Sequence, residues 1–266
     1  MPYRLIEKTQ FYYELHGEGE ALVFIHGLGA STQDWEAQVA FFEKKYQVIT
    51  FDLRGHGKTD KPEEPYSVQL FAIDVANVIR SLLGERTVHI IGHSLGGMVA
   101  FQLTLDSPEL VKTLTIINSA PAVILPRMRD HLFFYMRMIN IKLFGMHALA
   151  AHLAKLLFPR PEQENLREVF IKRWSENDPK AYLNSLRMFR GWNVMHRLTE
   201  IKCPTLIVTA DHDYSPITFK ELYTKLIPNA ELAVIKNSWH MTNLDQPDAL
   251  NVALNNFLEK HSGIIE

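Results

Sequence analysis

Apolar residues recur along the chain in two patterns, and these patterns alternate. An unbroken apolar run at residues 21–25 is typical of a strand buried on both faces of a sheet, whereas residues 68–83 repeat their apolar positions with helical spacing. Two short alternating stretches, 4–7 and 11–15, predict an antiparallel hairpin. Further strands are expected at 46–51, 87–91, 112–118, 205–210 and 230–235, and further helices at 32–44, 95–106, 217–226 and 247–261. This alternation predicts right-handed crossovers and a mostly parallel sheet covered by helices, so the fold class is α/β.

The alternation stops between residues 122 and 197. This stretch contains helical patterns at 129–138, 146–158 and 180–189 but no convincing strand, and it holds six of the nine methionines. A helical insertion between two strands of a sheet predicts a cap. We therefore expect a core made of residues 1–121 and 198–266, and an all-helical cap made of residues 122–197.

The composition of the chain argues against several classes of protein. The chain has 266 residues, 28 Lys and Arg against 30 Asp and Glu, and a net charge of -2. This balance lacks the excess of basic residues that a nucleic-acid binder uses, so we expect no nucleic-acid partner. No apolar stretch approaches the roughly 20 residues that span a bilayer, and the first residues do not form a signal peptide. Cys203 is the single cysteine, which excludes an internal disulfide and favours a cytoplasmic location.

The strongest chemical signal is the sequence Gly92-His93-Ser94-Leu95-Gly96-Gly97. It follows a predicted strand and precedes a predicted helix. A serine on such a tight turn needs small neighbours, because the backbone is strained there and approaches adjacent elements closely. The three glycines supply that space, so Ser94 is a candidate nucleophile.

With this motif in place, the sequence resembles the α/β-hydrolase superfamily, in its cap-bearing branch of serine esterases and lactonases. The resemblance covers essentially the whole chain, because hairpin, sheet, serine motif, cap, acid and histidine follow in the family's order. It implies the α/β-hydrolase fold, with a mostly parallel eight-stranded sheet flanked by helices and an inserted helical cap. It also implies a catalytic triad in the order serine, acid, histidine, with no cofactor and no metal.

The resemblance assigns the other two members of the triad. His240 follows the last predicted strand, where the family places its base, whereas His26, His56 and His93 are expected to be structural. Asp211 and Asp213 both follow the strand at 205–210. The family spacing of a glycine, two variable residues, the acid and a later proline favours Asp213 over Asp211, although Ala210 stands at the glycine position.

An oxyanion hole is also implied. The segment after the strand at 21–25 resembles the family's first oxyanion loop, which makes the Leu28 N–H one donor and the Leu95 N–H, directly after the nucleophile, the other. Leu95 also begins a predicted helix, whose positive dipole end favours an anion.

These features predict a serine hydrolase that cleaves a small-molecule carboxylic ester or lactone through an acyl-serine intermediate. A thioesterase or a carbon–carbon bond hydrolase would use the same triad, and a non-catalytic ligand receptor on this fold is the alternative from another class. The oligomeric state is not predicted by any of these residues.

The predicted cap carries its own candidates for substrate binding. Its large apolar residues, among them Met136 and Met138, are expected to form part of an apolar pocket wall. Residues 122–197 hold 13 Lys and Arg against 6 Asp and Glu, which leaves 15 against 24 in the rest of the chain. This asymmetry is explained either by solvated helix faces and ion pairs or by an anionic substrate, with Arg187 and Arg190 near Trp192 as its first candidate partners.

Overall fold

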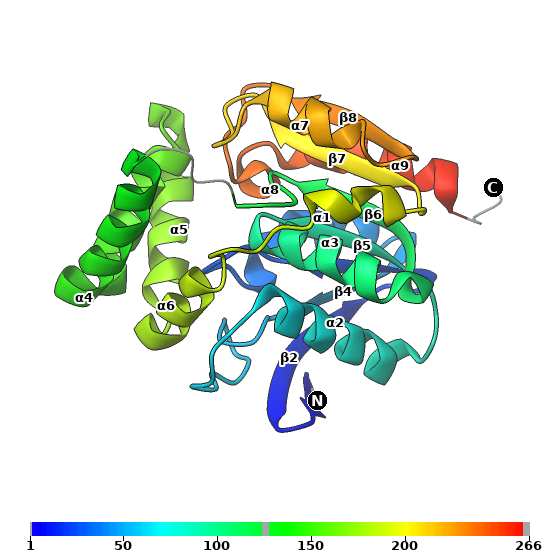
Figure 1. Cartoon of the computed structure of the whole chain (residues 1–266), viewed down its shortest axis with the longest axis horizontal. Helices are drawn as coiled ribbons and strands as arrows, with labels where there is room; N and C mark the ends of the chain where they lie inside the picture. The colour runs from blue at the N-terminus through cyan, green and yellow to red at the C-terminus, as the bar shows by residue number, and fades with distance from the viewer. Residues whose placement is uncertain (1, 124–127, 263–266) are drawn as a thin grey trace.

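The computed structural model describes residues 2–123 and 128–262, and a single eight-stranded sheet forms its centre (Figure 1). The strands are β1 Tyr3–Ile6, β2 Thr9–His16, β3 Glu20–Ile25, β4 Tyr46–Phe51, β5 Val88–His93, β6 Val111–Ile117, β7 Thr205–Ala210 and β8 Ala230–Ile235. Their order across the sheet is β1-β2-β4-β3-β5-β6-β7-β8. The pairs β1–β2 and β2–β4 are antiparallel and every later pair is parallel. The predicted α/β class and mostly parallel eight-stranded sheet are confirmed.

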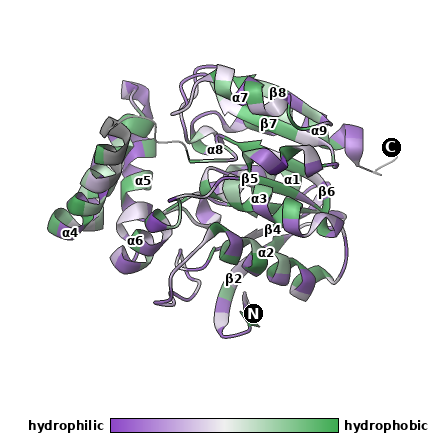
Figure 2. Ribbon diagram, viewed as in Figure 1, coloured by the Kyte–Doolittle hydropathy of each residue, from purple (hydrophilic) through white to green (hydrophobic). Residues whose placement is uncertain are grey.

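Helices cover both faces of this sheet (Figure 1). The helices are α1 Glu36–Phe42, α2 Val68–Leu83, α3 Leu95–Asp106, α4 Met128–Leu157, α5 Glu164–Ser175, α6 Pro179–Arg187, α7 Ile217–Thr224, α8 Thr242–Asp245 and α9 Pro247–His261, and of these α4, α5 and α6 lie beside the sheet rather than on its faces. The apolar residues of β3 pack alternately against the helices on the two faces of the sheet. Val23 and Ile25 pack in the cluster that contains α2 and α3, whereas Leu22 and Phe24 pack in the cluster that contains α1 and α9. Figure 2 shows hydrophobic colour along β7 as well.

Local signals set the ends of the helices. The Ser67 hydroxyl accepts a hydrogen bond from the Leu70 N–H (3.0 Å) at the start of α2, and Gly84 ends that helix with a φ of 68°. Pro247 opens α9, where its missing N–H costs no helical hydrogen bond. These positions explain why the expected and observed bounds of α2 and α9 coincide.

The segment of residues 122–197 leaves the sheet after β6 and returns to it before β7. Its two ends lie side by side, because the Val194 N–H donates to the Pro121 carbonyl (2.8 Å) and Ala122 forms a β-bridge with Asn193. Helices α4, α5 and α6 form a layer beside the core (Figure 1). In the described part of the chain, none of the helices combines the length and the apolar character that a bilayer crossing requires.

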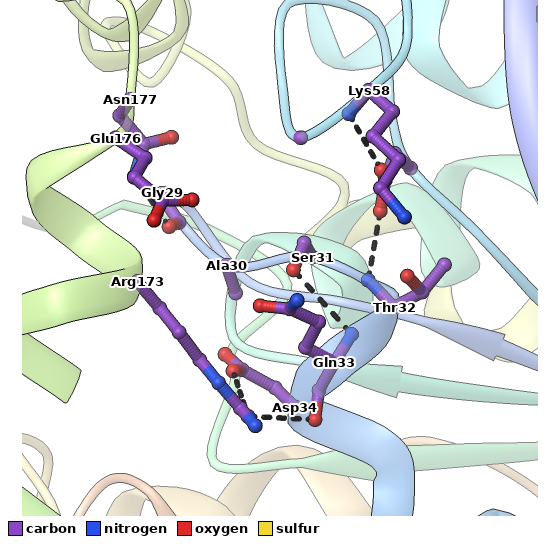
Figure 3. Close-up of a pocket in the computed structure, with 12 residues that line it drawn as sticks. Gly29, Ala30, Ser31, Thr32, Gln33, Asp34, Lys58, Arg173, Glu176 and Asn177 are labelled. Carbon is purple, nitrogen blue, oxygen red and sulfur yellow. Dashed lines mark hydrogen bonds and ion pairs between the residues drawn. The ribbon is translucent and has the colours of Figure 1, made fainter. Parts of the chain in front are cut away.

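Arg173 on α5 joins the helical layer to the core. Its guanidinium forms an ion pair with Glu36 (2.8 Å), donates to the Gln33 carbonyl (2.7 Å) and lies 3.4 Å from Asp34. Arg173, Gln33 and Asp34 border a polar pocket of about 160 Å³ between the loop after β3 and α5 (Figure 3). Burial raises the pKa of Asp34 to about 6 even though Arg173 acts in the opposite direction. Arg173 is therefore the cation that stabilises the ionised form of the buried Asp34 carboxylate.

We expect Arg173→Met to destabilise the chain more at pH 8 than at pH 5. Because the pKa of Asp34 is raised in the folded state, its ionisation costs stability, and that cost develops as the pH rises through the folded-state pKa. Without Arg173 the pKa of Asp34 rises further, so the extra cost is small at pH 5 and on the order of 1–3 kcal/mol at pH 8. Urea unfolding at both pH values measures the difference.

Lys180→Met is the matched control for this experiment. Lys180 pairs with Glu63 across the same two layers, but both side chains are exposed, so its loss should change the free energy of unfolding by about 0–1 kcal/mol at either pH. Equal losses at pH 5 and pH 8 for Arg173→Met would contradict the role assigned to Asp34.

Candidate active site

Ser94 lies on a strained turn between β5 and α3. Its backbone has a φ of 52° and a ψ of -114°, in a region that residues other than glycine rarely adopt. A Cβ atom on Gly92 would lie 2.3 Å from the Gly96 carbonyl oxygen, and one on Gly96 would lie 2.1 Å from the Ile25 carbonyl oxygen. Glycine is therefore required at both positions for the turn to pack against its own helix and against β3.

The structure brings the three predicted triad residues together. The His240 Nε2 atom lies 2.9 Å from the Ser94 Oγ atom, and its Nδ1 atom lies 2.6 Å from the Asp213 Oδ1 atom. Ser94 follows β5, Asp213 follows β7 and His240 follows β8, so all three come from the carboxyl edge of the sheet. In this arrangement the hydroxyl can donate to Nε2 while the Nδ1–H donates to the carboxylate.

The carboxylate of Asp213 is buried between two cationic or potentially cationic groups. Its Oδ2 atom lies 3.1 Å from the Lys220 Nζ atom, and both side chains are about 1% exposed. Burial alone would raise the pKa of Asp213, but the charges and hydrogen bonds of His240 and Lys220 outweigh it and hold the pKa below its usual value. Asp213 is therefore an anion when it meets the imidazole.

Lys220 also connects the acid to the serine turn. Its ammonium donates to the Ser119 carbonyl (2.6 Å), and the Ser119 hydroxyl donates to the Ser94 carbonyl (2.6 Å). Burial lowers the pKa of Lys220, although Asp213 acts in the opposite direction. Lys220 was not expected from the sequence. Its only signal there is its place on a short helix beyond Asp213.

Asp211, the other candidate acid, has a different set of partners. Its two carboxylate oxygens accept from the Asn237 N–H and the Ser238 N–H, each at 3.0 Å. Although burial acts to raise the pKa of Asp211, these backbone hydrogen bonds lower it. Asp211 thus fixes the loop that leads to His240, whereas Asp213 contacts the imidazole itself.

The loop that carries His240 is held from the sheet as well. The Asn118 side chain donates to the His240 carbonyl (2.8 Å) and accepts from the Ala210 N–H (2.7 Å), so it ties the ends of β6 and β7 to this loop. His93 Nε2 donates to the same His240 carbonyl (2.7 Å), and burial lowers the pKa of His93 to about 3. His93 is therefore a neutral structural donor, while Asn118 was not expected from the sequence.

The two backbone N–H groups predicted to form the oxyanion hole belong to Leu28, in the loop after β3, and Leu95, directly after Ser94. Among the residues that the structure describes, neither the Leu28 N–H nor the Leu95 N–H forms a hydrogen bond. Leu95 is the first residue of α3, where the helix dipole favours an anion. His26 holds the Leu28 loop, because its Nδ1 bonds the Gly27 carbonyl (2.8 Å) and its Nε2 accepts from the Leu53 N–H (2.9 Å).

The cap residues expected to bind substrate lie in several different environments. Met136 is 52% exposed on α4, and Met138 is half-buried against the core cluster. Trp192 is buried, and its indole N–H donates to Gln102 on α3 (2.9 Å). Through this hydrogen bond Trp192 joins the segment of residues 122–197 to α3 of the core.

The two arginines chosen from the sequence are both exposed. Arg187 donates to the neighbouring Asn184 side chain (3.1 Å), and Arg190 follows the end of α6. Within residues 2–123 and 128–262, no hydrogen bond or ion pair joins either arginine to the three triad residues, and their role in binding stays a prediction. The same residues contain no group of three or more His, Cys, Asp or Glu placed to hold a metal ion.

Comparisons with known proteins agree with this architecture. The model of the family described as alpha/beta hydrolase fold matches residues 20–140. The chain is 28% identical over 258 residues, 95% of each chain, to (E)-2-((N-methylformamido)methylene)succinate hydrolase of Acinetobacter baylyi. It is 28% identical to a putative carbamate hydrolase of Azorhizobium caulinodans, covering 97% of this chain and 98% of that one. The enol-lactonase of Burkholderia xenovorans superimposes with a TM-score of 0.89 and 22% identity, over 97% of this chain and 100% of the other.

We expect Lys220→Met to lower the free energy of unfolding at pH 7 by about 3–5 kcal/mol, because it leaves the Asp213 carboxylate buried without its ammonium partner. Urea denaturation measures the loss. Lys260→Met, which removes an exposed pair with Glu231, should cost about 0–1 kcal/mol. A loss for Lys220→Met as small as that of the control would show that the buried pair does not form.

Proposed function

Because the chain belongs to the α/β-hydrolase superfamily and its relatives are hydrolases, we propose that it is a serine hydrolase that cleaves a carboxylic ester or lactone. The observation that carries this proposal is the continuous chain of contacts from Asp213 through His240 to Ser94. A neutral hydroxyl is a weak nucleophile, and this arrangement provides both a base to accept its proton and an anion to orient that base.

In the first half of the proposed reaction, the Ser94 Oγ atom attacks the substrate carbonyl carbon while its proton passes to His240 Nε2. The carbonyl π bond opens, and the oxygen takes up the negative charge beside the Leu28 and Leu95 N–H groups. Asp213 stabilises the imidazolium that forms. When the tetrahedral intermediate collapses, the bond to the leaving oxygen breaks and His240 gives that oxygen the proton, which leaves an acyl-serine.

In the second half, water takes the place of the leaving group. His240 accepts a proton from the water as its oxygen attacks the acyl carbon, and the same two N–H groups stabilise the second oxyanion. Collapse breaks the acyl–oxygen bond, Ser94 recovers its proton from His240, and the carboxylic acid is released. Every proton transfer uses residues of this chain, and the reaction needs no cofactor.

We assign residues 122–197 the role of a cap that covers the substrate side of the site. Two of its aromatic side chains support this role, because a Cβ atom on Gly29 would lie 2.9 Å from Tyr182 and 3.1 Å from Trp174. These rings therefore pack directly on the loop that carries the Leu28 N–H. The cap and the oxyanion loop form one surface against which a substrate would bind.

A carbamate is the second candidate substrate, since one full-length relative is named a putative carbamate hydrolase. A further relative is named for a succinate derivative, which carries carboxylate groups. Turnover of an aryl ester, an aliphatic lactone and an aryl carbamate, measured side by side, separates these classes. A carbamate preferred over both other substrates would replace the ester or lactone assignment.

Ser94→Ala should lower kcat for an aryl ester by at least about 10³-fold, with residual catalysis from binding and the oxyanion donors only. The fold should be preserved, because the alanine side chain is smaller than the serine side chain and fits the same strained turn. Labelling by a fluorophosphonate should disappear in Ser94→Ala and persist in Ser107→Ala, a serine at the other end of α3. Labelling that persists in Ser94→Ala would place the nucleophile elsewhere.

Asp213→Asn should lower kcat at least about 100-fold, because an amide neither stabilises the imidazolium nor holds the correct tautomer. Asp211→Asn serves as the matched control and should cost much less, since Asp211 bonds the backbone of the loop and not the imidazole. Steady-state kinetics on one ester measures both variants. The reverse ranking would make Asp211 the acid.

A further inference from the structure

Arg137 on α4 is a cation without an anionic partner. Its guanidinium donates to the Tyr182 hydroxyl and lies over two aromatic rings, 5.3 Å from the Tyr182 centroid and 5.8 Å from the Trp174 centroid. In the described part of the chain no carboxylate forms an ion pair with it, and its Nε atom is buried without a hydrogen-bond partner. Arginine stays protonated in proteins, so the charge is permanent.

This lack of an anionic partner sets Arg137 apart from three other arginines of the helical layer. Arg167 pairs with Glu164, Arg173 with Glu36, and Arg197 with Asp106. These ion pairs neutralise part of the positive charge that residues 122–197 carry. Arg137 is half-buried, and removing a cation from water without an anion is unfavourable. The aromatic faces offset only part of that cost.

Aromatic rings connect the surroundings of Arg137 to the active site. Tyr182 and Trp174 pack on Gly29 of the oxyanion loop. The guanidinium is thus separated by single aromatic rings from the oxyanion loop. In the active site, Tyr214, the residue after Asp213, stacks on the His240 ring with centroids 4.2 Å apart.

Tyr214 lies within the electrostatic influence of Arg137. Burial raises the pKa of Tyr214 to about 12, and the charge of Arg137 is the main influence that acts in the opposite direction. The Tyr214 side chain is nevertheless 63% exposed, so solvent reaches this ring beside the base.

We propose that Arg137 binds a free carboxylate of the substrate, so that the enzyme acts on esters or lactones of an acid that carries a second carboxylate. This inference rests on the proposed function. A guanidinium matches a carboxylate in charge and in geometry, and the partly dehydrated aromatic surroundings strengthen the pair. Arg137 thereby takes the role in anion binding that the sequence suggested for Arg187 and Arg190.

The test compares two aryl esters, mono-(4-nitrophenyl) glutarate, which has a free carboxylate, and 4-nitrophenyl pentanoate, which has none. The measured quantity is the ratio of their kcat/KM values. Arg137→Met should lower this ratio at least about 10-fold, and Arg137→Lys should restore part of it. The neutral ester, measured in the same variant, corrects for any general change in the fold or the chemistry. Succinate and adipate esters define the best chain length.

Lys142→Met is the matched control, because it removes one positive charge from an exposed position on the same helix. It should leave the ratio as in the unmodified chain. An equal ratio in Arg137→Met would overturn the proposal. A ratio that falls in Arg187→Met or Arg190→Met, and not in Arg137→Met, would overturn it in favour of the exposed arginines.

Binding separates this proposal from the proposed function. Calorimetry with Ser94→Ala measures the affinity for mono-(4-nitrophenyl) glutarate without turnover, and Ser94→Ala/Arg137→Met should bind it at least about 10-fold more weakly. If the unmodified chain hydrolyses neither ester but this difference is found, the proposed function fails and the carboxylate site stands. If hydrolysis occurs and the two affinities are equal, the carboxylate site fails alone.

Discussion

The backbone of Ser94 is the constraint on which the rest of the site depends. A non-glycine residue at a φ of 52° is unfavourable by itself, so the surrounding packing must hold it there. Gly92 and Gly96 allow that packing, because each contacts backbone atoms at distances that exclude a side chain. Two consequences follow from the one turn. The hydroxyl lies at the carboxyl edge of the sheet, and the Leu95 N–H at the start of α3 has no hydrogen-bond partner among the described residues.

The acid is positioned by a second, electrostatic constraint. Asp213 is buried, and an isolated buried carboxylate would take up a proton and lose the charge that orients His240. The Lys220 ammonium supplies a positive charge beside the Asp213 Oδ2 atom, while the Oδ1 atom contacts the His240 imidazole. The same ammonium bonds Ser119, which bonds the Ser94 carbonyl. The acid and the serine turn are therefore held by one buried network, although they are more than 100 residues apart in the sequence.

Features that depend on local sequence could be predicted, and features that depend on distant contacts could not. The strands follow from their apolar runs, α2 and α9 follow from apolar periodicity and from the signals at their ends, and the serine turn follows from its glycines. Asp213 could be preferred to Asp211 only through family spacing, since both residues follow the same strand. Lys220 and Asn118 act through contacts across about 7 to 122 positions in sequence, and nothing near either residue marks it. The separate helical pattern expected from residue 146 agrees with the structure, because α4 is broken at Gly145 by a non-helical backbone.

The charge of the helical layer shows why a sequence total does not identify a binding residue. Residues 122–197 carry an excess of seven positive charges, and the two explanations considered for it apply to different residues. Arg173 and Arg197 form ion pairs with acidic residues of the core, as expected for residues that hold the helical layer against the core. Arg187 and Arg190 are exposed, where solvent and salt screen them strongly. Only the combination of partial burial, aromatic contacts and a missing anion distinguishes Arg137, and each of these properties arises from the packing of α4 against α5 and α6 rather than from the sequence around it.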